Sequence, residues 1–202
     1  MGVAVLDEVL RRSQALGFLG PGPVGEHAER AHAFEAALPA APDSFLDLGS
    51  GGGVPGLVLA TRWPARGVLL DAQARRVRFL QEALEELEVA HRVRAVHGRA
   101  EDTGRDPAHR GRYEVVTARS FGPPGITAEC GVAFLRTAGV LLVAEPPDVP
   151  ARWPSDGLAT LGLADEGTAS GGGATVRRLR LVTDLAATIP RRGPAMRRRP
   201  AF

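Results

Sequence analysis

The hydrophobic and polar positions of this chain follow two alternating periods. Short apolar runs end in polar or glycine residues, and between them lie longer stretches whose apolar residues recur every three or four positions. The short runs predict buried strands and the longer stretches predict amphipathic helices. The expected strands lie at residues 44–48, 67–71, 92–96, 113–118 and 139–144, and the expected helices at 55–62, 73–89 and 126–137. This alternation predicts an α/β fold with a mostly parallel central sheet, right-handed crossovers and helices on both faces.

The flanking segments have patterns of their own. Residues 3–16 and 24–38 have apolar residues at helical spacing, and a Gly-Pro-Gly-Pro break separates them. Further strands are expected within 159–163 and 174–182, with a triple-glycine turn at 171–173. The last residues contain too much Pro, Gly and Arg for a regular element. We therefore expect an N-terminal helical segment (1–42), a Rossmann-like domain (43–188) and a basic C-terminal tail (189–202).

Composition narrows the class of protein. No run approaches the ~20 apolar residues that span a bilayer, and the first ten residues contain Asp7 and Glu8 and lack the pattern of a signal peptide. The single cysteine, Cys130, excludes an internal disulfide and a Cys-rich zinc site, and the five histidines show no metal-binding spacing. We expect a cytoplasmic protein with no membrane segment and no metal.

The positive charge is unevenly distributed. Lysine is absent, so all 25 basic residues are arginine, which is typical of a GC-rich genome. The net charge is only +2, but residues 177–202 contain a cluster of arginines with Asp184 as the one acid. This end is a candidate surface for an anion such as RNA, with a solvated tail as the alternative. The arginines are Arg177, Arg178, Arg180, Arg191, Arg192, Arg197, Arg198 and Arg199.

The strongest chemical signal is a glycine-rich segment directly after the first expected strand. Residues 45–48 run into Gly49-Ser50-Gly51-Gly52-Gly53, and Pro55 suits the first turn of a helix. The pattern D-x-G-x-G-x-G, which starts at Asp47, is typical of class I methyltransferases that use S-adenosyl-L-methionine (SAM). The acid can order the loop and face the cationic methionine end of the cofactor. With Gly56 as a third glycine the segment also fits the dinucleotide pattern G-x-G-x-x-G, so a nucleotide site is the alternative.

Acidic residues also follow the next two strands. Asp71 ends the second strand, where a carboxylate can accept hydrogen bonds from both ribose hydroxyls. NAD proteins share this feature, and Asp71 could instead cap the following helix. The segment 98–102, which contains Ala100 and Glu101, follows the third strand. In the methyltransferase layout it contacts the adenine, although it equally fits a polar turn.

Taken together, these segments resemble the RsmG (GidB) family, whose members methylate guanine N7 in small-subunit ribosomal RNA. The resemblance rests on residues 45–56, 70–72, 75–80, 98–101 and 118–121, and more weakly on 189–193. It implies a Rossmann-like class I SAM-dependent methyltransferase with Gly49, Val54, Ala100, Glu101 and Arg119 at the SAM site. The full set of candidate cofactor-binding residues is Asp47, Gly49, Ser50, Gly51, Gly53, Val54, Asp71, Ala72, Ala100, Glu101 and Arg119.

The sequence departs from the family where the methyl acceptor would bind. The family's Lys-Gly pair after the fifth strand is replaced by Glu145-Pro146-Pro147, and its Asn-Leu-Thr segment near the N-terminus is absent. A small-molecule methyltransferase, or a SAM-binding paralogue without RNA activity, therefore stays open beside the RNA enzyme. Guanine N7 has a free lone pair and needs no general base, so no catalytic residue is assigned. Arg119 is a candidate on the acceptor side, and an oxygen acceptor would require a base near Arg119 or Glu145.

Overall fold

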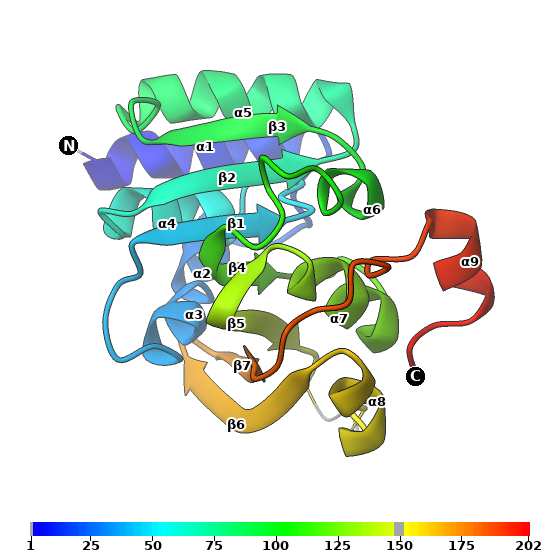
Figure 1. Cartoon of the computed structure of the whole chain (residues 1–202). Helices are drawn as coiled ribbons and strands as arrows, with labels where there is room; N and C mark the ends of the chain where they lie inside the picture. Colours follow the sequence, from blue (N-terminus) through cyan, green and yellow to red (C-terminus); the bar gives the residue numbers. More distant parts are fainter. Residues whose placement is uncertain (1, 148–151) are drawn as a thin grey trace.

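The computed structural model describes residues 2–147 and 152–202 and contains a seven-stranded sheet with the strand order β3-β2-β1-β4-β5-β7-β6 (Figure 1). Strands β1 to β5 are parallel, whereas β7 is antiparallel to both of its neighbours. The strands are β1 (Ser44–Leu48), β2 (Arg66–Asp71), β3 (Val93–His97), β4 (Tyr113–Ala118), β5 (Leu135–Glu145), β6 (Leu163–Gly171) and β7 (Ala174–Leu181).

Two hydrophobic clusters cover the two faces of the sheet. In β1, Phe45 packs in one cluster and Leu46 and Leu48 in the other, as expected for a strand that is buried on both faces. The cluster of Phe45 includes side chains from α1 (Gly2–Ala15), α2 (Val24–Glu29), α3 (His32–Ala36), α4 (Gly56–Arg62) and α5 (Ala74–Glu86). The opposite cluster includes side chains from α6 (Ala100–Thr103), α7 (Pro124–Val132), α8 (Ser155–Thr160) and α9 (Gly193–Arg198).

The strand order locates the expected ligand site. From β1 the chain proceeds through β2 and β3 toward one edge of the sheet and then returns to β4 on the other side of β1. The connections after β1 and β4 therefore diverge, which opens a crevice at the carboxyl ends of these two strands. Ligands of open α/β sheets bind in such crevices.

The N-terminal helices pack onto this framework at two points. Helix α1 contacts α5, where Arg12 donates hydrogen bonds of 3.1 and 2.6 Å to the Glu86 carboxylate. The junction between α2 and α3 contacts the turn between β6 and β7, so closely that a Cβ atom added to Gly172 would collide with the carbonyl oxygen of Glu29. The helices thus form one wall above the carboxyl ends of β4 and β5.

Most expected strands agree with the structure. Strands β1 and β4 match residue for residue, and β2 and β3 match within one residue at each end. The expected turn between β6 and β7 is also present, at Gly172 and Gly173. The helix expected over 24–38 is instead two helices, α2 and α3, separated at Arg30 and Ala31.

Three further expectations were wrong. The helix expected to reach residue 137 ends at Val132, because Leu135 pairs with Tyr113 of β4 and starts a longer β5. Residues 159–162 do not form a strand, since a helix occupies Ser155–Thr160 and β6 starts at Leu163. The tail is not irregular throughout but contains α9, whose Met196 packs its sulfur 3.8 Å from that of Cys130. A buried contact of this kind outweighs the weak local propensity of a Pro- and Arg-rich segment.

Candidate functional site

The glycine loop lies between the carboxyl end of β1 and the start of α4, in the crevice described above. The backbone N–H of Ser50 donates to the Leu70 carbonyl at 2.9 Å, and the N–H of Gly51 donates to Asp71 Oδ2 at 2.9 Å. From the other side, Ser13 of α1 donates its hydroxyl to the Gly52 carbonyl at 2.8 Å. The loop is therefore fixed by β2 and by the N-terminal helix.

Asp71 organises two segments at the end of β2. Its Oδ1 accepts a hydrogen bond of 2.8 Å from the backbone N–H of Gln73, in addition to the bond from Gly51 to Oδ2. Arg76 lies 3.8 Å from the same Oδ2. The carboxylate thus holds the glycine loop and the N–H of Gln73, the residue before α5. The N-cap of α5 is Gln73 and has no side-chain cap bond, so the helix-capping role expected as the alternative for Asp71 was wrong.

Asp47 lies beneath the loop and is only 1% exposed. Its Oδ1 accepts a 2.7 Å hydrogen bond from the Thr117 hydroxyl of β4, while its Oδ2 has no hydrogen-bond partner among the described residues. Burial raises the pKa of Asp47 to about 6, and the bond from Thr117 partly offsets this effect. Asp47 therefore links β1 to β4 under the loop.

The glycines of the loop divide into two groups by what a side chain would meet. A Cβ atom would lie 2.7 Å from the Phe121 ring at Gly49 and 2.5 Å from Asp47 Oδ2 at Gly56, and it would collide with Leu57 at Gly53. At Gly51, whose φ is +52°, the nearest protein atom would be 3.7 Å away. Gly51 is thus the position where the protein leaves space for a ligand.

The other expected residues lie around this loop. Val54 is buried at the entry to α4, and the exposed Ala72 follows Asp71, where its carbonyl lies 3.1 Å from His97 Nε2. Ala100 and Glu101 begin α6 after β3 and are both buried. Arg99 donates a 2.9 Å hydrogen bond to Glu101. The polar-turn interpretation of this segment and the site interpretation are compatible.

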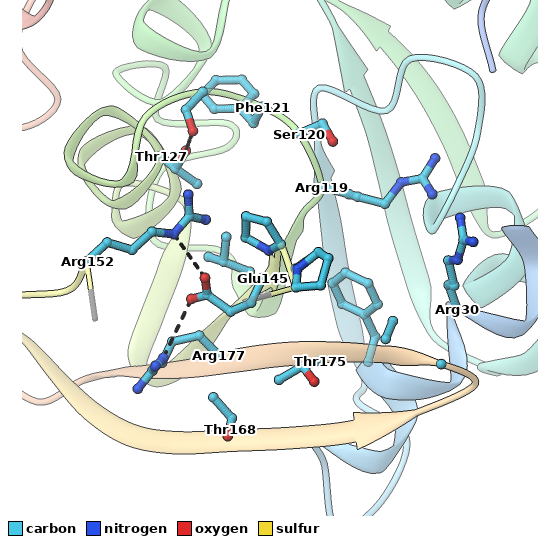
Figure 2. Close-up of a pocket in the computed structure, with 18 residues that line it drawn as sticks. Arg30, Arg119, Ser120, Phe121, Thr127, Glu145, Arg152, Thr168, Thr175 and Arg177 are labelled. Carbon is cyan, nitrogen blue, oxygen red and sulfur yellow. Dashed lines mark hydrogen bonds and ion pairs between the residues drawn. The ribbon is translucent and has the colours of Figure 1, made fainter. Parts of the chain in front are cut away.

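A cavity of about 960 Å³ adjoins the loop at the carboxyl ends of β4 and β5 (Figure 2). Arg119 and Phe121 line it from the segment after β4, and Phe121 connects it to the glycine loop through the contact with Gly49. Arg30 and Phe34 line it from the N-terminal helices. The sequence interpretation assigned no site role to Arg30, Phe34 or Phe121; Phe121 alone had a signal, its place next to Arg119 in the family-like segment.

Glu145 is held in the wall of this cavity by basic and polar partners. Arg152 donates a 2.9 Å hydrogen bond to Oε2, and Arg177 Nε lies 3.6 Å from Oε1 (Figure 2). The indole N–H of Trp153 also donates to Oε1. The acid found in place of the family's basic residue thus gathers two arginines. A carboxylate with these partners is poorly placed to act as a general base.

The expected arginine-rich surface divides into paired and exposed residues. Arg177 also bonds Asp165 at 2.9 Å, and Arg178 and Arg180 share Glu166, so each arginine of β7 has an acidic partner. In the tail, Arg191 bonds the fully buried Glu129 at 2.8 and 2.5 Å. Three tail arginines are exposed, and the side chain of Arg197 lies outside the described residues; the exposed ones are Arg192, Arg198 and Arg199.

Two kinds of site are not found in the described part of the chain. Among residues 2–147 and 152–202, no group of three or more His, Cys, Asp or Glu side chains is placed to hold a metal ion. Within the same residues, no helix is both long enough and apolar enough to cross a membrane.

Solved structures with a similar fold include two methyltransferases in complex with S-adenosyl-L-homocysteine. An RNA methyltransferase from Salinibacter ruber is 21% identical with a TM-score of 0.56, covering 83% of this chain and 96% of that chain. An O-methyltransferase from Bacillus cereus is 15% identical with a TM-score of 0.62, covering 89% of this chain and 91% of that chain. At these identities the likeness shows the fold, which is the Rossmann-like class I methyltransferase fold expected from the sequence.

Closer sequence relatives carry one shared name. The ribosomal RNA small subunit methyltransferase G of Leuconostoc citreum is 37% identical over 108 residues, which are 53% of this chain and 45% of the relative. The protein of the same name from Chloroflexus aggregans is 38% identical over 120 residues, 59% of this chain and 48% of the relative. This chain thus spans about half the length of the curated relatives it matches. Because the family model for rRNA small subunit methyltransferase G matches residues 31–145, more than half of the 202 residues, this chain belongs to the GidB family.

Proposed function

We propose that this chain is a SAM-dependent methyltransferase that transfers a methyl group to guanine N7 of small-subunit ribosomal RNA. The observation that carries the proposal is the bond from Gly51 to Asp71 at the crevice between β1 and β4, in a chain that belongs to the GidB family. The bond brings together the glycine loop and the strand-end acid, the two features that a nucleoside cofactor with an amino-acid tail requires.

The residues around the loop fit SAM. Asp71 would accept hydrogen bonds from the ribose hydroxyls, and the open space at Gly51 would admit the cofactor next to the backbone. Ala72, Ala100 and Glu101 would flank the adenosine end. The loop from Gly49 to Val54 would surround the methionine end, with Asp47 below it and Arg119 beside it. Bound SAM supplies an electrophilic methyl group on a sulfonium ion.

The chain's contribution to the reaction would be positional. Guanine N7 attacks through a lone pair and has no proton to lose, so the site needs no general base. The environment of Glu145 agrees with this, because its carboxylate is engaged by Arg152 and Trp153. The cavity lined by Phe34 and Phe121 offers apolar surface for an unpaired base. Holding the base in line with the methyl group would account for the rate acceleration of the methyl transfer.

The exposed tail arginines are the proposed contact with ribosomal RNA outside the cavity. Arg192, Arg198 and Arg199 are exposed, and arginine forks match phosphate geometry. Arg191 has a different task because it neutralises Glu129. Removing the whole tail would therefore disturb folding as well as RNA binding, and single substitutions at the exposed positions are the better test.

Two measurements test the proposal. Isothermal titration calorimetry should show binding of SAM and S-adenosylhomocysteine and no binding of NADH. The proposed site holds a cofactor without a pyrophosphate, whereas NADH contains one. Tight binding of NADH together with no binding of SAM would overturn the assignment of SAM as the cofactor. The protein should then transfer the methyl group of radiolabelled SAM to the RNA of ribosomal subunits taken from cells that lack this gene. Label in a metabolite extract instead of in RNA would favour a small-molecule acceptor.

A further inference from the structure

Two arginines from distant parts of the chain share the cavity next to the glycine loop. Arg119 follows β4, and Arg30 ends α2 in the N-terminal segment. In Figure 2 both guanidinium groups lie on the same side of the cavity, away from Glu145 and its partners. Arg30 also lies one residue before the part of the chain that matches the family.

The partners of these two arginines leave their charge largely uncompensated. Arg119 is half-buried and has no hydrogen bond or ion pair within residues 2–147 and 152–202. The pKa of Arg119 is lowered, chiefly by burial. The charge of Asp47 opposes this effect, and the charge of Arg30 adds to it. Arg30 has an exposed contact of 3.5 Å with Glu26 on its own helix, and an exposed pair of this kind contributes little.

The other arginines of the same cavity differ in this respect. Arg152 is bonded to Glu145, and Arg177 lies between Glu145 and Asp165. Two like charges that share a partly buried site repel each other, and a bound anion relieves the repulsion. The fork of donors on each guanidinium suits the paired oxygens of a carboxylate or phosphate.

We propose that Arg30 and Arg119 together form an oxyanion-binding site at the boundary between the glycine loop and the cavity. The site rests on the proposed function, which offers two sources of the same chemistry. One is the carboxylate at the methionine end of SAM, and the other is a phosphodiester next to the nucleotide that enters the cavity. Arg30 is the new element, since neither the family match nor the sequence interpretation assigns it a role.

The test compares Arg30→Gln and Arg119→Gln with Arg11→Gln as a matched control. Arg11 is also an exposed arginine paired with a glutamate on its own helix, Glu8 of α1, and it does not line the cavity. All three variants lose the same charge. Calorimetry measures binding of S-adenosylhomocysteine and of 5′-methylthioadenosine, which lacks the amino-acid part. Fluorescence anisotropy measures the affinity of a single-stranded RNA oligonucleotide at several salt concentrations.

Either source gives its own result. If the anion is the carboxylate, Arg30→Gln lowers the affinity for S-adenosylhomocysteine at least about tenfold and leaves the affinity for 5′-methylthioadenosine unchanged. If the anion is a phosphate, S-adenosylhomocysteine binds as before, and the slope of log affinity against log salt decreases by about 0.7. Arg119→Gln should change the same quantity, and Arg30→Lys should restore part of it.

The inference is overturned if Arg30→Gln equals Arg11→Gln in all three measurements while circular dichroism shows that both are folded. This result leaves the proposed function intact, provided that the wild type binds SAM and labels RNA. Conversely, a wild type that binds no SAM refutes the proposed function, whereas a changed RNA slope in Arg30→Gln would still support the anion site.

Discussion

Asp71 and Asp47 have similar side chains but different tasks, because their surroundings differ. Asp71 accepts two backbone N–H bonds at the end of β2 and is 5% exposed. Asp47 is enclosed beneath the loop, where its side chain accepts a hydrogen bond from Thr117 and its backbone carbonyl accepts one from Ser50. Both hold the glycine loop, and Asp71 is in addition the proposed acceptor for the ribose hydroxyls.

Replacing Asp71 by alanine should weaken SAM binding by about 1.5–3 kcal/mol, through the loss of charge-assisted hydrogen bonds. Part of the loss would come from the Gly51 N–H, which the carboxylate now holds in place. Calorimetry measures the effect, with circular dichroism to verify the fold. Asp102→Ala removes the same charge from an exposed position nearby and should bind SAM normally. An unchanged dissociation constant in Asp71→Ala would remove this residue from the site.

Gly51→Val should abolish SAM binding while the protein still folds. A Cβ atom at this position would meet no protein atom closer than 3.7 Å, although the φ of +52° disfavours a β-branched residue. Gly53→Ala should behave differently, since its Cβ would collide with Leu57 and destabilise the protein itself. Thermal unfolding and calorimetry on both variants separate the two effects. A Gly51→Val variant that binds SAM normally would show that the ligand lies elsewhere.

The raised pKa of Asp47 predicts a pH-dependent stability. The folded protein holds this proton up to a pKa of about 6, whereas the ordinary pKa of a free aspartate side chain is 3.8. Between these values the folded state binds more protons than the unfolded state, so stability falls as pH rises. Asp47→Asn carries no such proton. Relative to wild type it should therefore gain up to roughly 3 kcal/mol between pH 4 and pH 7, since each pKa unit is worth about 1.4 kcal/mol. Urea unfolding at both pH values measures this, and equal pH dependence of the two proteins would contradict it.

At the scale of elements, the C-terminal segment is fastened to the domain at several points. Arg110 donates to the carbonyls of Ile189 and Ala186, and Arg105 donates to that of Pro190 at 2.8 Å. Figure 1 shows the segment leaving β7, passing α7 and ending beyond α9. The sequence predicted a basic tail without these bonds. The bonds join residues about eighty positions apart, so they leave no local pattern in the sequence.

Arg191→Gln should destabilise the protein because it leaves the fully buried Glu129 without its positive partner. Breaking a fully buried pair costs about 3–5 kcal/mol. Since the Arg191 side chain is 34% exposed, we expect roughly 2 kcal/mol, measured by urea unfolding. Arg192→Gln, the exposed neighbour, should change stability by less than about 0.5 kcal/mol. Equal stability of the two variants would show that the Arg191 bond contributes nothing.

The elements that the sequence predicted well are those whose patterns are local. In β1 and β4, apolar runs bounded by polar or glycine residues define both ends. Asp47 lies in β1, directly before the glycine loop, and Asp71 is the last residue of β2. The boundary between α7 and β5 was missed because residues 133–137 suit a helix as well as a strand, and pairing of Leu135 with Tyr113 decides it. The place of Arg30 in the cavity was not predictable, since it depends on how the end of α2 packs against the β6–β7 turn.

For the whole molecule, the sheet and the N-terminal helices together create a site that neither part contains alone. The carboxyl ends of β1, β2 and β4 supply the loop, Asp71 and Arg119. Helix α1 holds the loop through Ser13, and Arg30 lies directly after α2. The resulting cavity lies directly beside the glycine loop. This adjacency is what a methyl transfer from a bound cofactor to a second substrate requires.

The most direct test of the account is the identity of the methylated atom. Small ribosomal subunits from cells that lack this gene would be incubated with the protein and isotopically labelled SAM, and the digested RNA analysed by mass spectrometry. Methyl transfer to guanine N7 predicts labelled N7-methylguanosine with the wild type and none with Gly51→Val. A wild type that binds SAM but leaves the RNA unlabelled, or labels another atom, would contradict it.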